Sequence, residues 1–258
     1  MAEQPLAGRV AVITGVSRRI GIGFAVAERM AAMGAGLLVQ SHTAYDAAQP
    51  WGADPGGVAP LLAALRTHGG RVEHVAADFL DPAAPAKVIA AAVAAYGHVD
   101  ILVANHAYSV DGALEEVTAE QIDLHMAINV RGSLLLVQAF AAQHDDGRPG
   151  GRVVLLTSGQ HLGPMPSELA YIASKGALHQ LTWSLSAHLI PRGITVNTVN
   201  PGPTDTGWAP PELTEQVRLH APLGRWGRPE DAARLIAWLA TDDAAWITGQ
   251  VINSTGGF

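Results

Sequence analysis

The stretch Arg9-Val10-Ala11-Val12-Ile13-Thr14-Gly15 begins the pattern that decides the fold. Its apolar run predicts a buried strand over residues 9–14, which passes through a glycine turn into an amphipathic helix over residues 21–33. A strand that leads through glycines into a helix is the first half of a β-α-β unit, whose strands pair in parallel.

The same alternation of short strands and helix-length segments continues to the end of the chain. It predicts further strands at 37–40, 71–75, 99–104, 152–157, 194–199 and near 251, and helices at 58–68, 83–96, within 119–143, around 171–189 and at 230–240. Residues 46–57 are rich in proline and glycine and predict a loop. We therefore expect a single doubly wound α/β domain of the Rossmann type over residues 1–258. Its sheet should be mostly parallel, with helices on both faces and ligands at the carboxyl ends of the strands.

Composition excludes several classes of protein. The 258 residues carry a net charge of -7, which argues against nucleic acid as a partner because phosphate binding needs clustered cations. There is no cysteine, hence no disulfide or thiolate metal site, and no histidine pattern typical of metal ligands. No apolar run approaches the roughly 20 residues that a membrane span needs. We expect a soluble cytoplasmic protein without a metal or a membrane partner.

The segment Tyr171-Ile172-Ala173-Ser174-Lys175 carries the clearest chemical signal. Four residues apart on a helix, the phenol and the ammonium leave the same face, and a nearby cation draws a phenol pKa toward the working range. The hydroxyl of Ser158, thirteen residues upstream, could hold a substrate carbonyl against the phenol. The set predicts proton transfer to or from an oxygen on carbon. A packed tyrosine beside a solvated lysine, as in many helices, is the alternative.

The glycine turn and the end of the second strand predict a dinucleotide site. Glycines 15, 21 and 23 precede a helix, where backbone N–H groups can approach a pyrophosphate. The second strand ends in Ser41-His42 without the acidic residue that would repel a 2′-phosphate, and Arg18 or Arg19 can supply positive charge. NADP is therefore favoured over NAD. The alternative for both arginines is a solvated loop.

Two polar residues follow the next strands. Asp78 could accept a hydrogen bond from the adenine amino group, or it could cap the following helix. Asn105 could tie neighbouring strands together and line the floor beneath a cofactor.

In order and spacing these motifs resemble the short-chain dehydrogenase/reductase family, in the subgroup that includes β-ketoacyl-(acyl carrier protein) reductases and many carbonyl reductases. The resemblance covers residues 10–257. The motifs that carry it are the Thr14-Gly15 turn, Asp78, Asp100 before Ile101-Leu102-Val103, Asn105, Ile128-Asn129-Val130, Gly151-Arg152-Val153 before Ser158, Tyr171 with Lys175, Asn200-Pro201-Gly202 with Thr206, Pro222-Leu223-Gly224-Arg225, Pro229-Glu230-Asp231 and Thr248-Gly249-Gln250.

The resemblance implies an NADP(H)-dependent oxidoreductase that interconverts a ketone, such as a 3-oxoacyl group, and a secondary alcohol. Tyr171 would be the general acid/base and Lys175 would lower its pKa, while Ser158 would orient the substrate oxygen and Asn129 would hold a water that connects Lys175 to solvent. Residues 204–222 would form a mobile cap over the substrate, and the chains would form a homotetramer or homodimer on the helices of Asn129 and Tyr171. The implied cofactor-binding residues are Gly15, Ser17, Arg18, Gly21, Ile22, Ser41, His42, Asp78, Phe79, Asn105, Tyr171, Lys175, Pro201, Thr204 and Thr206.

Three positions depart from the family pattern. Five residues separate Gly15 from Gly21 where three are usual, His106 stands where a small residue is usual, and Thr255 stands where aspartate is common. The longer loop is also similar to that of enoyl reductases, which reduce C=C bonds but have a longer Tyr-to-Lys spacing. The motifs are also compatible with an NAD-dependent alcohol dehydrogenase of the same family, or with a non-catalytic dinucleotide-binding sensor.

Overall fold

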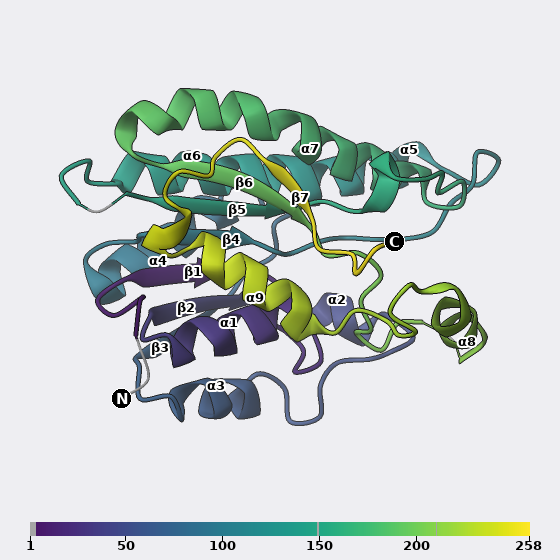
Figure 1. Ribbon diagram of the computed structural model, residues 1–258, viewed down its shortest axis with the longest axis horizontal. Coiled ribbons are helices and arrows are strands. Elements are labelled where there is room, and N and C mark those ends of the chain that lie inside the picture. The colour runs from purple at the N-terminus through teal and green to yellow at the C-terminus, as the bar shows by residue number, and fades with distance from the viewer. Residues whose placement is uncertain (1–3, 149, 210) are drawn as a thin grey trace.

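A seven-stranded sheet forms the centre of the computed structural model, which describes residues 4–148, 150–209 and 211–258. Its strand order is β3-β2-β1-β4-β5-β6-β7, and every neighbouring pair is parallel (Figure 1). The prediction of a doubly wound α/β fold is confirmed. The strands are β1 (Val10–Ile13), β2 (Gly36–Ser41), β3 (Val72–Ala76), β4 (Ile101–Ala104), β5 (Arg152–Leu156), β6 (Thr195–Asn200) and β7 (Val251–Asn253).

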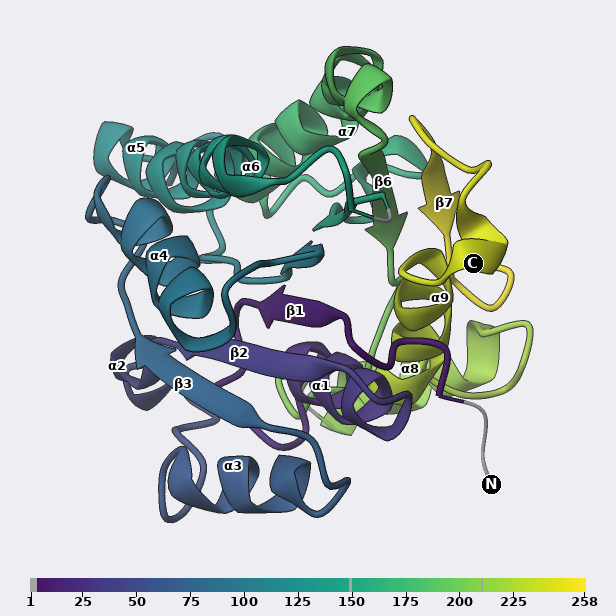
Figure 2. The same ribbon diagram turned by 90° about the vertical axis from the view of Figure 1, so that its left-hand side faces the viewer.

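Helices cover both faces of the sheet (Figure 2). On one face α1 (Ile22–Ala32), α3 (Ala59–Arg66) and α9 (Pro229–Leu239) pack on a core that includes Ala11 and Ile13. On the other face α4 (Ala84–Tyr96), α6 (Gly132–Gln143) and α7 (Leu169–Leu189) pack on a core that includes Val12. Successive side chains of β1 thus enter opposite cores, as the period of two in a strand requires.

One long helical stretch contains an irregular turn. The helix α5 (Ala119–His125) begins at Thr118, whose side chain forms a reciprocal capping box with Gln121. It continues through the π-helical turn η1 (Met126–Arg131) into α6. A π turn shifts the register of the side chains that follow it and is often found at functional sites. Asn129 lies in this turn.

The stretch Ala119–Gln143 does not meet the expectation that no segment of the chain is long and apolar enough to span a membrane. By length and mean hydropathy it is long and apolar enough to cross one. In this fold, however, Leu136, Val137 and Phe140 from the stretch are buried in the second core. A core helix passes the same test of length and composition, so the finding carries no assignment to a membrane.

Two helices at the carboxyl ends of the strands were not predicted as helices. The helix α2 (Thr43–Ala47) overlaps the start of the segment predicted as a loop, and α8 (Pro211–His220) lies within the predicted cap. Both are found at the same end of the sheet (Figure 1). Five residues are too short for a helical period to be recognised in sequence, which explains the error at α2. Pro210, which falls within the predicted cap of residues 204–222, is outside the described residues.

Candidate active site

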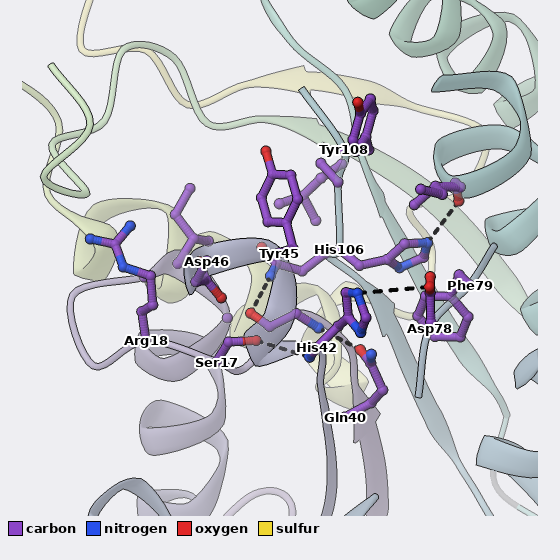
Figure 3. A pocket seen from close by; sticks show the side chains of 18 of the residues that line it. Ser17, Arg18, Gln40, His42, Tyr45, Asp46, Asp78, Phe79, His106 and Tyr108 are labelled. Atoms are coloured by element: carbon purple, nitrogen blue, oxygen red, sulfur yellow. Dashed lines mark hydrogen bonds and ion pairs between the residues drawn. The ribbon is translucent and has the colours of Figure 1, made fainter. Parts of the chain in front are cut away.

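A cavity of about 520 Å³ lies at the carboxyl ends of β1, β2, β3, β4, β5 and β6. Figure 3 shows the part that extends from the glycine turn to Tyr108. The cavity brings together most of the site residues that the sequence predicted. Those that line it are Gly15, Ser17, Arg18, Gly21, Ile22, His42, Asp78, Phe79, Asn105, Tyr171, Lys175, Pro201 and Thr206.

The glycine turn is packed too closely for side chains. Gly15 has a φ of +72°, and a Cβ atom there would lie 2.9 Å from the His106 Cα. A Cβ on Gly23 would lie 2.5 Å from the Gly15 carbonyl oxygen. The Asn105 amide nitrogen donates to the carbonyls of Thr14 (3.0 Å) and Gly15 (3.2 Å), so Asn105 ties β4 to this turn, as predicted.

The two arginines of the lengthened glycine loop lie apart. Arg19 turns away from the cavity, because its backbone N–H donates to Asp54 (2.6 Å) and its guanidinium donates to the Pro60 carbonyl (3.1 Å). Arg18 lines the cavity, with its guanidinium carbon 5.6 Å from the centre of the Trp51 ring. Only Arg18 of this pair is therefore placed to supply charge to a ligand.

The two residues at the end of β2 also lie differently. Ser41 is buried, and its hydroxyl is hydrogen-bonded to the His74 Nε2 at 2.8 Å. It does not line the cavity, which corrects the prediction that Ser41 contacts a cofactor. His42 does line the cavity, its backbone N–H donates to Ser17 (3.1 Å), and its imidazole lies 3.7 Å from the Asp78 carboxylate.

Tyr171 and Lys175 lie one turn apart on α7 and face the cavity together. The Lys175 ammonium donates to the Leu156 carbonyl at 3.0 Å and lies 5.6 Å from the centre of the Tyr171 ring. Burial raises the pKa of Tyr171 to about 12, although a hydrogen bond with Ser158 opposes the rise. Burial also lowers the pKa of Lys175 to about 8. The expected lowering of the tyrosine pKa is therefore not found, because desolvation outweighs the effect of Ser158, and the nearby Glu168 and Tyr45 raise the pKa further.

Asn129 connects this helix to the loop that follows β4. Its amide oxygen accepts from the Tyr108 N–H (2.7 Å), and its amide nitrogen donates to the Tyr108 carbonyl (2.9 Å) and to the Ser174 hydroxyl (2.9 Å). Asn129 itself is completely buried. Its side chain thus positions the loop and α7 relative to each other, and the predicted contact of Asn129 with water stays a prediction.

His106, the unusual residue after β4, is a packed part of the cavity floor. Its Nδ1 lies 2.8 Å from the Thr14 hydroxyl and its Nε2 lies 3.1 Å from the Ile128 carbonyl, while its ring lies against Phe79. Because a carbonyl only accepts, Nε2 carries the proton and Nδ1 accepts from Thr14. Burial lowers the pKa of His106 to about 3, so the ring is neutral.

The residues after β6 form one wall and the base of the cap. Pro201 and Thr206 line the cavity, whereas the buried Thr204 hydroxyl is directed to the carbonyls of Pro201 and Gly202, both at 3.2 Å. The indole N–H of Trp208 donates to the Thr204 carbonyl at 3.1 Å. The base of the cap is thus fixed, and mobility of the cap stays a prediction.

Sequence reasoning missed an aromatic cluster between the cavity and α5. The Tyr45 hydroxyl donates to the Ser109 carbonyl (3.1 Å) and accepts from the Ser109 N–H (3.2 Å). The rings of Tyr45 and Tyr108 lie 5.8 Å apart, and those of Tyr108 and His125 lie 4.8 Å apart. Tyr45 lies in α2, which was not predicted as a helix. Its contact with Ser109 could have been predicted only if that helix had been recognised in the sequence. No group of three potential metal ligands gathers anywhere in the described part of the chain.

Comparisons with known proteins agree with this arrangement. Residues 15–258 match the family model described as Enoyl-(Acyl carrier protein) reductase. An uncharacterized oxidoreductase, YjdA, of Bacillus subtilis is 39% identical over 251 residues, which are 97% of this chain and 96% of that protein. A short-chain dehydrogenase/reductase of Serratia marcescens is similar in structure, with a TM-score of 0.88, 35% identity and coverage of 98% of this chain and 99% of that one.

A third similar structure is that of the angucycline C-6 ketoreductase LanV with bound NADP. Its TM-score is 0.86 at 35% identity, and the match covers 99% of this chain and 97% of that one. Each match with a relative or a solved structure covers nearly all of this chain and nearly all of the other protein. The chain therefore belongs to the short-chain dehydrogenase/reductase family of oxidoreductases.

Proposed function

We propose that this protein interconverts a ketone and a secondary alcohol with NADP(H) as its preferred cofactor. The observation that carries the proposal is that one cavity contains both the glycine turn and the Tyr171–Lys175 pair. A protein that only binds a dinucleotide would not need a half-buried phenol, close to Ser158 and one turn from an ammonium, at the other end of that cavity.

The cavity fits a dinucleotide. At Gly15 and Gly23 a Cβ atom would clash with backbone, so the turn is formed as a narrow, side-chain-free surface, and α1 begins directly after it. Such a turn suits a pyrophosphate, while Asp78 and His42 would lie at the adenosine part and Lys175 at the nicotinamide ribose. A bound nicotinamide would supply or accept the hydride.

The proton chemistry would be performed by the chain itself. With a pKa of about 12, Tyr171 is protonated at neutral pH and can donate to the oxygen of a carbonyl substrate. Ser158 would hold that oxygen, and the Lys175 ammonium would stabilise the phenolate that remains. In the oxidising direction the phenol must first lose its proton, after which the phenolate would accept the proton of the alcohol.

The preference for NADP is supported by two observations. Arg18 lines the cavity close to the end of β2, where no acidic residue follows the strand directly. The similar ketoreductase LanV is known with NADP bound. The aromatic cluster of Tyr45, Tyr108 and His125 supports a substrate with a flat or apolar body, without selecting among acyl, aromatic and polyketide ketones.

The substitution Tyr171→Phe tests the proposal. Single-turnover oxidation of NADPH in the presence of a ketone should fall by about 10³-fold, because the proton donor is lost. The affinity for NADPH, measured by fluorescence titration, should stay within about twofold of the wild type, since the ring remains in place. Unchanged turnover would rule out Tyr171 as the acid.

We also propose that the protein assembles as a homotetramer or homodimer through the helices that carry Asn129 and Tyr171. Trp183 on α7 is 69% exposed, which is unusual for so large an apolar side chain. Light scattering at micromolar concentration should give a mass of at least twice 26.9 kDa. A monomeric mass would contradict this part of the proposal.

A further inference from the structure

One end of the cavity contains a carboxylate that the sequence analysis did not consider. We call the part formed by Ser17, Arg18, His42 and Asp46 the ribose end, because the end of β2 faces the adenosine ribose in this fold class. Asp46 lies on α2, five residues beyond the last residue of β2. It is only 8% exposed and lines the cavity with the other three residues (Figure 3).

The Asp46 carboxylate is fixed by neighbours from two loops. Burial raises its pKa, while Trp51, Arg18 and Ser17 oppose the rise. The buried Trp51 N–H has no hydrogen bond of ordinary geometry to any residue that the structure describes, yet it lies near enough to lower this pKa. The Trp51 ring also lies against the Arg18 guanidinium. Trp51 therefore lies against Arg18 and near Asp46 at the ribose end.

The charges at the ribose end are mixed rather than basic. Arg18 brings one positive charge and Asp46 one negative charge, and His42 is paired with the Asp78 carboxylate at 3.7 Å. A 2′-phosphate carries close to two negative charges, which Arg18 attracts and Asp46 repels. A ribose 2′-hydroxyl can instead donate a hydrogen bond to a carboxylate. The two side chains therefore act on the two cofactors in opposite directions.

We propose that Asp46 is a specificity-determining residue that limits the preference for a 2′-phosphate created by Arg18. The inference rests on the proposed function, because it requires that the cavity bind a nicotinamide dinucleotide. It goes beyond that proposal because it states that Asp46, which lies on α2 and not at the end of β2, sets how strongly NADP is preferred over NAD. The charge of Asp46, rather than its size, is the property that acts.

The test compares NADPH and NADH affinities of three proteins by fluorescence titration. Asp46→Asn removes the charge and keeps the size, and it should tighten NADPH binding about tenfold and weaken NADH binding about threefold. Asp54→Asn is the matched control, since Asp54 carries the same charge but accepts a hydrogen bond from the Arg19 N–H and does not line the cavity. For Asp54→Asn, the ratio of NADPH affinity to NADH affinity should stay within about twofold of the wild-type ratio.

The outcomes separate this inference from the proposed function. If the wild type binds both cofactors and Asp46→Asn leaves their affinity ratio unchanged, this inference alone is wrong. If Asp54→Asn shifts the ratio as much as Asp46→Asn does, anchoring of the loop is the cause and the inference is also wrong. If the wild type binds neither cofactor, both proposals fail. Should Asp46→Asn not fold, Asp46→Ser, which is also neutral, gives the same comparison.

Discussion

The two ends of the cavity are built in different ways. At the end for which we propose proton transfer, called the catalytic end below, Tyr171 and Lys175 lie on a single helix, and Ser158 follows the end of a neighbouring strand. At the ribose end, the four residues Ser17, Arg18, His42 and Asp46 come from a loop, a strand end and a short helix. Arg18 and Asp46 lie beside Trp51, and His42 lies beside Ser17 and Asp78. Spacing along regular elements therefore predicts the position of site residues well, whereas the positions of site residues in loops depend on tertiary contacts.

The largest expected effect is at the catalytic end. Lys175→Met should lower the turnover number for ketone reduction by about 10³-fold, because the phenolate loses its cation. The same substitution removes an ammonium whose pKa burial lowers to about 8, so the free energy of unfolding at pH 7 should rise by about 1 kcal/mol despite the loss of the bond to Leu156. Steady-state kinetics and urea denaturation measure the two effects. If Lys175→Met lowered both the turnover number and the free energy of unfolding, the inference that the buried ammonium destabilises the fold would be wrong.

The next effect concerns the connection between the two ends. Asn129→Ala leaves the Tyr108 N–H and carbonyl without partners, so the free energy of unfolding should fall by about 2 kcal/mol. Turnover should fall by about 10²-fold because α7 and the loop lose their mutual position, while the NADPH affinity should change by less than about threefold. Ser133→Ala is the control, because that side chain donates only to the Asn129 carbonyl. An equal effect of both substitutions would contradict a special role for Asn129.

The pH dependence should also come from the catalytic end. As the pH rises through about 8, Lys175 loses its proton, since burial lowers its pKa to that value. The cation that stabilises the phenolate then disappears, so the rate of ketone reduction at saturating NADPH should fall roughly tenfold between pH 7.5 and 9.5. His106, with a pKa of about 3, should contribute nothing in this range. A rate that stays constant up to pH 10 would show that the charge of Lys175 is not required.

The smallest effect should appear at the ribose end and distinguish its two arginines. Arg18→Ala should weaken NADPH binding about fivefold and leave NADH binding nearly unchanged. Arg19→Ala should change neither affinity by more than about twofold, because the Arg19 side chain is bound to the Pro60 carbonyl. Fluorescence titration gives all four values. Equal losses for the two variants would remove the distinction that the structure draws between them.

Sequence reasoning predicted the fold in most of its detail, and it predicted that Tyr171 and Lys175 lie together, although Ser158 is not among the residues that line the cavity. Alternating apolar segments placed every strand to within about two residues, because strands buried on both faces are continuous apolar runs. The helical spacing of Tyr171 and Lys175 was sufficient to place both in one cavity. The direction of the Tyr171 pKa shift was wrong, because burial depends on residues that pack around the ring from distant parts of the chain.

The ribose end was predicted less well. Ser41 is the last residue of β2 and His42 follows the strand, so their sequence does not show that Ser41 is withdrawn to a contact with His74 on β3. Arg18 and Arg19 are adjacent in a loop without any period. Asp46 and Tyr45 lie in a helix of five residues, too short to be recognised. At each of these positions, contacts with residues distant in sequence determine whether the side chain lines the cavity.

The π turn at Met126–Arg131 has a consequence for insertions and deletions in this chain. A π turn holds one residue more than the α-helical turn it replaces, so one residue deleted from it would be absorbed by closing the turn to α geometry. His125 would still face Tyr108, and the core contacts of α6 would remain. One residue deleted from the regular part of α6 would instead rotate the two sides of the deletion by about 100° relative to each other, so the wide turn is the place in the long helix that tolerates a change of length.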